Sequence, residues 1–105
     1  MNWIASPQTD EDLIAGRDYI QADNDEAARA FLDVAFETFD RLAQFPEMGA
    51  RVRTKASALK NVRFVVLPPP YSRWIVFYEP HASGVYIRRV LCGNMDWRGQ
   101  PRRFF

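Results

Sequence analysis

The sequence has 105 residues, of which 48% are hydrophobic, 14% aromatic and 26% charged. This length is typical of one domain with a single hydrophobic core, and the supply of large apolar side chains excludes an intrinsically disordered chain. No apolar run reaches the roughly 18 residues of a membrane-spanning helix, and the first residues do not resemble a signal peptide, so we expect a cytoplasmic protein without a membrane partner.

The charges separate along the chain. Residues 1–50 contain three basic and eleven acidic side chains, a net charge of −8, whereas residues 51–105 contain eleven basic and two acidic ones, a net charge of +9. A basic half of this kind attracts an acidic protein or a nucleic acid. The alternative is internal pairing, in which acidic helices lie on a basic sheet.

The chain has one cysteine, Cys92, and one histidine, His81. A single thiol cannot form an internal disulfide, and one thiol with one histidine cannot form a typical zinc site, so we expect no metal and no cofactor. We interpret Cys92 as a core or strand-end residue rather than a nucleophile. Because turn-forming residues surround His81, we interpret it as an exposed turn residue rather than a general base.

Two helices are predicted in the acidic half. The first begins at the capping residue Ser6, followed by Pro7, and extends to about residue 22. Its apolar side consists of Leu13, Ile14 and Ile20. Residues 1–5, which precede this helix, are a candidate edge strand.

The second predicted helix follows the turn residues 23–26 and carries the clearest periodicity in the sequence. Its apolar residues recur at spacings of three and four: Ala28, Phe31, Leu32, Ala35, Phe39 and Leu42. The helix ends at Phe45, because the proline that follows disfavours helical geometry in the residue before it. The short connection predicts antiparallel packing of the two helices.

Three strands are predicted in the basic half, at residues 62–67, 74–78 and 85–91, from their β-branched and aromatic residues. A turn at residues 81–84 closes the last two into a hairpin, and three consecutive prolines predict an extended, polyproline-like bend between the first two. These elements predict an α+β fold, with an N-terminal antiparallel helical hairpin packed on a three- to four-stranded antiparallel sheet. We expect a single domain over residues 1–105.

Several short stretches, in this order and spacing, resemble the ParE/RelE superfamily of bacterial toxin–antitoxin toxins. Residues 45–49 resemble the family's helix exit with its Pro-x-x-Gly turn, residues 70–78 its strand with a terminal aromatic pair, and residues 87–96 its closing strand with a His-Gly-x-Arg-Asp type ending. The motif positions are Pro46, Gly49, Tyr71, Tyr78, Cys92, Gly93, Met95 and Asp96. In the last stretch, Cys92 replaces the usual histidine and Met95 the usual arginine.

The resemblance implies the toxin of a type II toxin–antitoxin system, with a cognate antitoxin as its partner. Within the superfamily, ParE-like toxins poison DNA gyrase and are not known for a hydrolytic site, whereas RelE-like toxins cleave mRNA on the ribosome. We favour the ParE-like branch, because Met95 cannot stabilise phosphate charge and no tyrosine or histidine follows it. We therefore predict no catalytic residues. The alternatives are a ribosome-dependent mRNA endonuclease and a non-toxic binding module of the same fold.

Basic side chains are the candidates for binding the partner, since antitoxins of this class are typically acidic segments that fold on the toxin. The candidates are Arg51, Arg53, Lys55, Lys60, Arg63, Arg73, Arg88 and Arg89. The alternative is a solvated charged surface without a dedicated partner. Three aromatic residues, Tyr71, Trp74 and Tyr78, have the chemistry to stack on nucleobases, but we prefer to interpret them as sheet packing.

Overall fold

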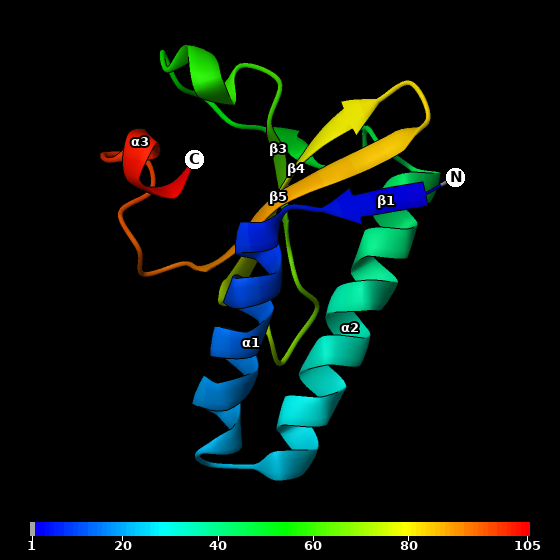
Figure 1. The fold of residues 1–105 in the computed structure, drawn as a ribbon, viewed down its shortest axis with the longest axis vertical. Helices are drawn as coiled ribbons and strands as arrows, with labels where there is room; N and C mark the ends of the chain where they lie inside the picture. The colour runs from blue at the N-terminus through cyan, green and yellow to red at the C-terminus, as the bar shows by residue number, and fades with distance from the viewer. Residues whose placement is uncertain (1) are drawn as a thin grey trace.

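The computed structural model describes residues 2–105. In chain order its elements are β1 (Asn2–Ala5), α1 (Pro7–Gln21), α2 (Asp25–Gln44), β2 (Ala50–Arg51), the 3₁₀ helix η1 (Ser57–Leu59), β3 (Arg63–Val66), β4 (Trp74–His81), β5 (Gly84–Cys92) and α3 (Pro101–Phe104). Figure 1 shows α1 and α2 side by side, extending away from the strands to a turn at their far end. The predicted helical hairpin is therefore confirmed.

The sheet has five strands in the order β1-β5-β4-β3-β2. The three predicted strands form an antiparallel meander as β3, β4 and β5. The expected edge strand is present for Asn2–Ala5, and residue 1 lies outside the described part of the chain. The prediction of a wholly antiparallel sheet of three to four strands is wrong, because β1 pairs with β5 in parallel and β2 adds an edge of only two residues. So short a strand leaves no periodicity in the sequence.

The first turns of α1 close the part of the β5 edge that β1 leaves free. Ser6 caps the helix as predicted, its Oγ accepting a hydrogen bond from the backbone N–H of Thr9 at 3.1 Å. The same Oγ donates to the carbonyl of Arg88 at 2.7 Å, and Thr9 Oγ1 donates to the carbonyl of Ile87 at 3.1 Å. One turn later, Asp12 Oδ2 accepts the backbone N–H of Val90 at 3.0 Å. Spacings of three residues place these side chains on one helix face, which replaces a neighbouring strand.

The apolar side of α1 differs from the prediction at one residue. Leu13 is buried and Ile20 packs against the core, but the side chain of Ile14 is 50% exposed. Close contact with α2 falls instead at Gly16, where an added Cβ would lie 2.8 Å from Cζ of Phe31. A small residue at this position lets the two helices approach each other. The spacing of apolar residues does not reveal such a contact, because glycine has no apolar side chain.

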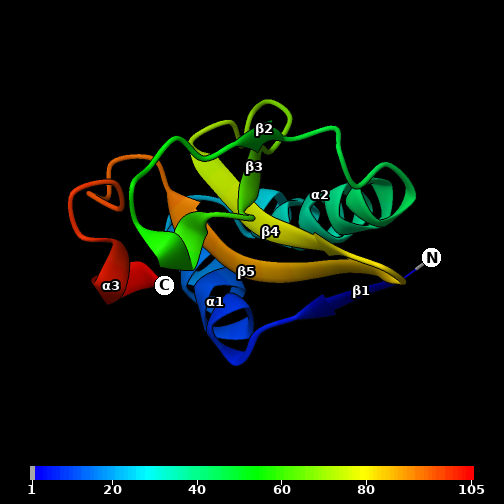
Figure 2. The same ribbon diagram turned by 90° about the horizontal axis from the view of Figure 1, so that it is seen from above.

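The predicted stripe of α2 is confirmed. Phe31, Ala35, Phe39 and Leu42 are fully buried against the sheet, Ala28 is buried and Leu32 is partly buried. Seen from above in Figure 2, both helices lie on the same face of the sheet. This face carries the larger of two hydrophobic clusters, with Val76, Tyr78 and Ile87 contributed by the strands.

The opposite face of the sheet carries a second hydrophobic cluster, which the sequence did not predict. Phe77 is its centre, with the ring centroid of Trp97 at 4.7 Å and that of Phe105 at 5.1 Å. Leu59 of η1 belongs to the same cluster. The segment after residue 96, for which no element was predicted, therefore folds back over the sheet and includes α3.

A β-bulge interrupts the pairing of β4 with β5. Phe77 pairs with Arg89 but Tyr78 pairs with Ile87, so Arg88 is the extra residue. Both arginines reach the folded-back segment, Arg88 Nη2 donating to the carbonyl of Phe105 at 3.3 Å and Arg89 Nη1 to that of Phe104 at 2.7 Å.

The connections around β4 differ in detail from the predictions. Between β3 and β4, turns are closed by hydrogen bonds from Tyr71 N to Pro68 O at 2.9 Å and from Trp74 N to Tyr71 O at 3.0 Å. The expected extended, polyproline-like bend is therefore not formed. His81 is exposed as predicted, but it ends β4 instead of lying in the turn.

The helices described in residues 2–105 are all too short or too polar to cross a membrane.

We expect Asp12→Ala to lower the free energy of unfolding by about 2 to 4 kcal/mol, because it leaves a half-buried guanidinium and a strand N–H without their acceptor. Asp12 accepts two hydrogen bonds from Arg89, at 2.7 Å and 2.8 Å, and its side chain is only 12% exposed. Urea unfolding followed by circular dichroism gives the difference.

The matched control is Asp18→Ala on the same helix. Asp18 pairs with Arg17 at the surface, its side chain 60% exposed, so its removal should cost less than about 1 kcal/mol. Equal losses in the two variants would contradict the role given to Asp12.

Candidate partner-binding site

Two of the eight candidate arginines and lysines form ion pairs inside the fold. Arg89 binds both carboxylate oxygens of Asp12, and this hydrogen bonding raises the pKa of the Arg89 guanidinium above its ordinary value, against the opposing effect of burial. Arg88 forms an ion pair with Glu79 at 3.1 Å. Their side chains are about one-fifth exposed, so the structure gives them a role in holding β5, α1 and the C-terminal segment together.

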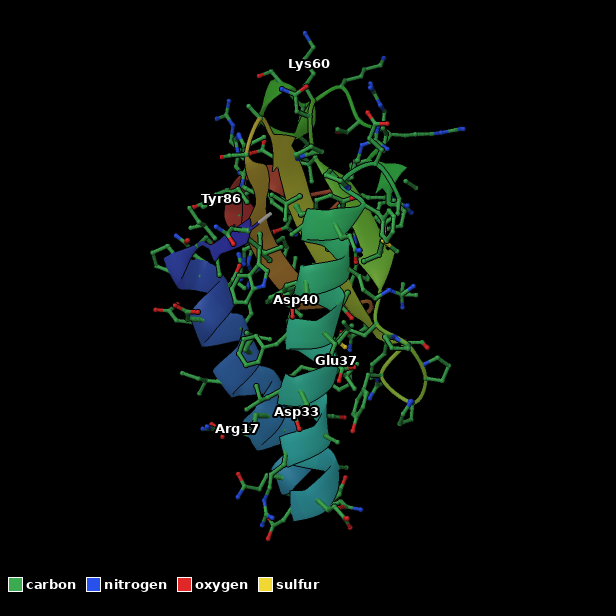
Figure 3. The ribbon with its side chains drawn as sticks, turned by 90° about the vertical axis from the view of Figure 1, so that its right-hand side faces the viewer. Arg17, Asp33, Glu37, Asp40, Lys60 and Tyr86 are labelled. Carbon is green, nitrogen blue, oxygen red and sulfur yellow. The ribbon has the colours of Figure 1, made fainter. Side chains whose placement is uncertain are left out.

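Internal pairing does not account for the charge separation along the chain. Of the three ion pairs within residues 2–105, only that of Arg89 with Asp12 joins the acidic half to the basic half. Figure 3 shows Asp33, Glu37 and Asp40 in succession along α2, and Lys60 at the end of the molecule opposite the α1–α2 turn. These three carboxylates and Lys60 therefore lie on different parts of the surface.

Four candidates form a continuous segment of exposed cations, which we call the basic loop surface. They are Arg51, Arg53, Lys55 and Lys60. All lie on or beside β2 and η1, and none takes part in an ion pair formed within the described chain. Their charges are therefore available to an acidic partner.

Arg63 and Tyr78 anchor the start of this loop. Arg63 Nη1 donates to the carbonyls of Glu47, at 3.2 Å, and Gly49, at 2.8 Å. The hydroxyl of Tyr78 donates to the carbonyl of Pro46 at 2.7 Å and accepts the N–H of Gly49 at 2.9 Å. Three motif positions thus meet at one buried hydroxyl, and they position the loop rather than contact solvent.

Gly49 is required by this close approach. A Cβ at this position would lie 2.6 Å from the Tyr78 hydroxyl and 2.8 Å from the carbonyl oxygen of Phe64. Burial raises the pKa of the Tyr78 phenol above 10.0, and the hydrogen bond from Gly49 and the charge of Arg63 act in the opposite direction. The phenol is therefore protonated and able to donate at physiological pH.

Tyr71 and Trp74 are buried, as the packing interpretation predicts. The Tyr71 hydroxyl donates to the carbonyl of Ala27 at 2.8 Å and so ties the β3–β4 connection to α2. Both rings contact Phe31, with centroids at 5.6 Å and 5.1 Å. Each residue is only 6% exposed, so packing accounts for both rings.

A pocket of about 290 Å³ lies between α1 and the adjoining ends of β4 and β5. We call it the α1–β5 pocket. Its lining residues are Asp12, Ala15, Gly16, Tyr19, Arg73, Trp74, Val90, Cys92, Asn94 and Met95. The stripe of α1 that lines it has small residues in the middle, which leaves the hollow.

The last motif lies at this pocket. Cys92 is the half-buried final residue of β5, as predicted, and Met95 is 44% exposed at the rim. Gly93 N donates to the carbonyl of Arg73 at 2.6 Å, which joins the motif to the start of β4. Asp96 is exposed and its Oδ1 accepts the N–H of Gly99 at 3.0 Å, so it forms a local turn.

Arg73 is the remaining candidate and stands at the rim of the α1–β5 pocket. Its guanidinium carbon lies 5.9 Å from the ring centroid of Tyr19 and 5.8 Å from that of Trp74. Contact with both rings holds the charge in place.

Some candidate positions were missed from the sequence. Arg102 and Arg103 are exposed and share a hollow of about 530 Å³ with Arg88 and Arg89. The double arginine near the C-terminus was the available signal, but no partner role was assigned to it. Tyr19 lies in the first predicted helix, and its proximity to Arg73 depends on the tertiary fold.

In the part of the chain that the structure describes, no three side chains of His, Cys, Asp or Glu come close enough to hold a metal ion. His81 and Arg73 lie at or beside opposite ends of β4 and do not form one site.

Comparison with known families gives a match over residues 4–97 to the family described as ParE toxin of type II toxin-antitoxin system, parDE. Among solved structures, the chain is similar to one described as the chromosomal ParDE TA system from P. aeruginosa, with a TM-score of 0.68 and 19% identity. That alignment covers 88% of this chain and 95% of the other. At this identity the likeness shows a shared fold. No curated protein sequence matches the chain.

We predict that Tyr78→Phe lowers the free energy of unfolding by about 1 to 3 kcal/mol, because the Gly49 N–H loses its acceptor and the Pro46 carbonyl its donor. Urea unfolding measures the loss. Tyr86→Phe, which removes a hydroxyl from a half-buried tyrosine of β5, is the matched control and should change stability less. A loss in Tyr78→Phe no larger than in the control would contradict the anchoring role.

The raised pKa of Tyr78 also predicts a pH dependence. Above pH about 10 the unfolded chain loses the phenol proton that the folded protein retains, so stability falls as pH rises towards the folded pKa and is intact below about pH 10. Tyr78→Phe lacks this group. The stability difference between the two proteins should therefore narrow above about pH 10 in urea unfolding, and parallel profiles would contradict the prediction.

Proposed function

The chain belongs to the family of ParE toxins of type II toxin–antitoxin systems, and from this membership we propose that it inhibits bacterial growth by binding a target such as DNA gyrase in the cytoplasm. We further propose that a cognate acidic antitoxin neutralises it. The resemblance found from sequence motifs is thus confirmed for the family, and the target and the antitoxin are the proposed steps.

The observation that carries the antitoxin proposal is the basic loop surface. Its four cations are exposed and without ion pairs inside the described fold, on a loop that Arg63 and Tyr78 fix to the sheet. A fixed array of like charges attracts an oppositely charged chain and raises its association rate. An acidic segment that folds on binding is the partner that suits it.

The pocket chemistry supports a binding toxin over a nuclease. RNA cleavage needs an acid–base pair beside cations that stabilise the phosphate. Met95 gives the α1–β5 pocket a thioether where related motifs have an arginine, and His81 lies at the other end of β4 from Arg73. The side chains gathered here therefore suit contact with a protein better than phosphate chemistry.

Induced expression in a bacterial host separates the proposed mechanisms. Gyrase poisoning predicts filamentation and a DNA-damage response, whereas mRNA cleavage predicts rapid arrest of translation. The absence of any growth defect would contradict both toxin mechanisms and favour a non-toxic binding module. Expression of the Met95→Arg variant in parallel tests whether the absence of an arginine at this position limits toxicity.

Co-expression tests the antitoxin. A short acidic protein encoded beside this chain should restore growth and co-purify with it. Reversing Arg51, Arg53 and Lys55 to glutamate together should weaken the complex at least about tenfold and reduce its salt dependence. Reversing three exposed arginines outside this surface, Arg29, Arg41 and Arg98, changes the net charge by the same amount and is the control. Equal losses in both variants would indicate that only total charge matters.

A further inference from the structure

We propose that the α1–β5 pocket receives one large apolar side chain of the acidic antitoxin, with a carboxylate of the same segment bound to Arg73. This inference rests on the proposed function, since it names how that partner is held. It is distinct from the basic loop surface, which adjoins the other end of β4: β2 pairs with β3 at Arg63, and Arg63 pairs with Tyr78.

The shape of the pocket fits a single inserted side chain. One wall is the α1 stripe of Asp12, Ala15, Gly16 and Tyr19, and Trp74 and Val90 belong to the strands opposite. The volume of about 290 Å³ exceeds the roughly 150 Å³ cavity that holds a benzene molecule. One aromatic or long aliphatic side chain therefore has room to enter.

Two large apolar side chains at the rim of the pocket are exposed. Tyr19 is 63% exposed and Met95 is 44% exposed, on opposite sides formed by α1 and the loop after β5. A methionine adapts its shape to an entering side chain, and a tyrosine supplies a large rigid surface. Apolar side chains gathered at the mouth of a hollow are typical of an interaction site.

The charged side chains around the pocket indicate which class of partner it can bind. The carboxylate of Asp12 is already satisfied by Arg89 and by the N–H of Val90. Arg73 belongs to none of the ion pairs formed between residues 2 and 105, and its contacts are with Tyr19 and Trp74. The pocket therefore presents a positive charge without a counter-charge beside an apolar hollow. An apolar anchor with a neighbouring aspartate or glutamate complements both.

Cys92 provides a built-in reporter, because it is the chain's only thiol and lines this pocket. The probe is the acidic protein encoded beside this chain, purified as the complex. The rate of Cys92 alkylation by iodoacetamide should fall at least about tenfold in the complex, because the inserted side chain covers the thiol. An unchanged rate would overturn the proposal. Protection that appears in the chain alone and grows with its concentration would identify a second copy as the occupant and would also overturn it.

Substitutions at the pocket test the same proposal through the affinity of the chain for the antitoxin. Ala15→Phe fills the hollow from the exposed face of α1, and Arg73→Glu reverses the charge at the rim. Each should raise the Kd of the complex about tenfold or more, as expected for the centre of an interface. The matched controls are Ala30→Phe and Arg29→Glu, exposed positions on α2 that should leave the Kd unchanged. Circular dichroism melting verifies that each variant is folded.

The outcomes separate this inference from the proposed function. If the wild-type chain binds no acidic neighbour, the antitoxin proposal fails and the pocket proposal fails with it. If the wild type binds but the pocket variants bind equally well, only the pocket proposal fails. If Ala15→Phe does not fold, Arg73→Glu and the Cys92 rates still decide between these results.

Discussion

The fold depends on how the open edge of β5 is closed. β1 pairs only with the first half of that strand, and Ser6, Thr9 and Asp12 of the α1 segment bind three further backbone groups along the same edge. An edge strand left open would invite pairing with another chain. Because these polar contacts fix α1 beside β5, they also set where α2 packs and where the hollow between α1 and the strand ends is formed.

This closure also explains which charges are left for a partner. Arg89 forms an ion pair with Asp12, and Arg88 forms one with Glu79, so the two arginines of β5 act inside the molecule. Within the basic half, the cations that stay exposed are on the β2–η1 loop, on the C-terminal segment and at Arg73. The two binding surfaces that we propose therefore lie toward opposite ends of β4.

Much of the fold could be predicted because its signals are local. The period of α2, the cap at Ser6 and the β-branched runs of the meander are properties of short segments, and all are confirmed. The errors concern long-range relations: the direction of β1, the exposure of Ile14, and the return of Trp97 and Phe105 onto Phe77. In the same way, the sequence indicated the basic residues as one group of candidates. Only the tertiary contacts of Arg88 and Arg89 distinguish these two from the exposed arginines and lysines.

The bulge at Arg88 has a consequence for how this family member can change over evolutionary time. Side chains alternate between the two faces of β5. The extra residue shifts this alternation by one position, so that Ile87 and Val90, which are three residues apart, both face the helices. Deleting or adding one residue there would exchange the helix-facing and outward-facing sets along the rest of the strand. The number of residues between Ile87 and Val90 should therefore be under stronger selection than the identity of the individual residues.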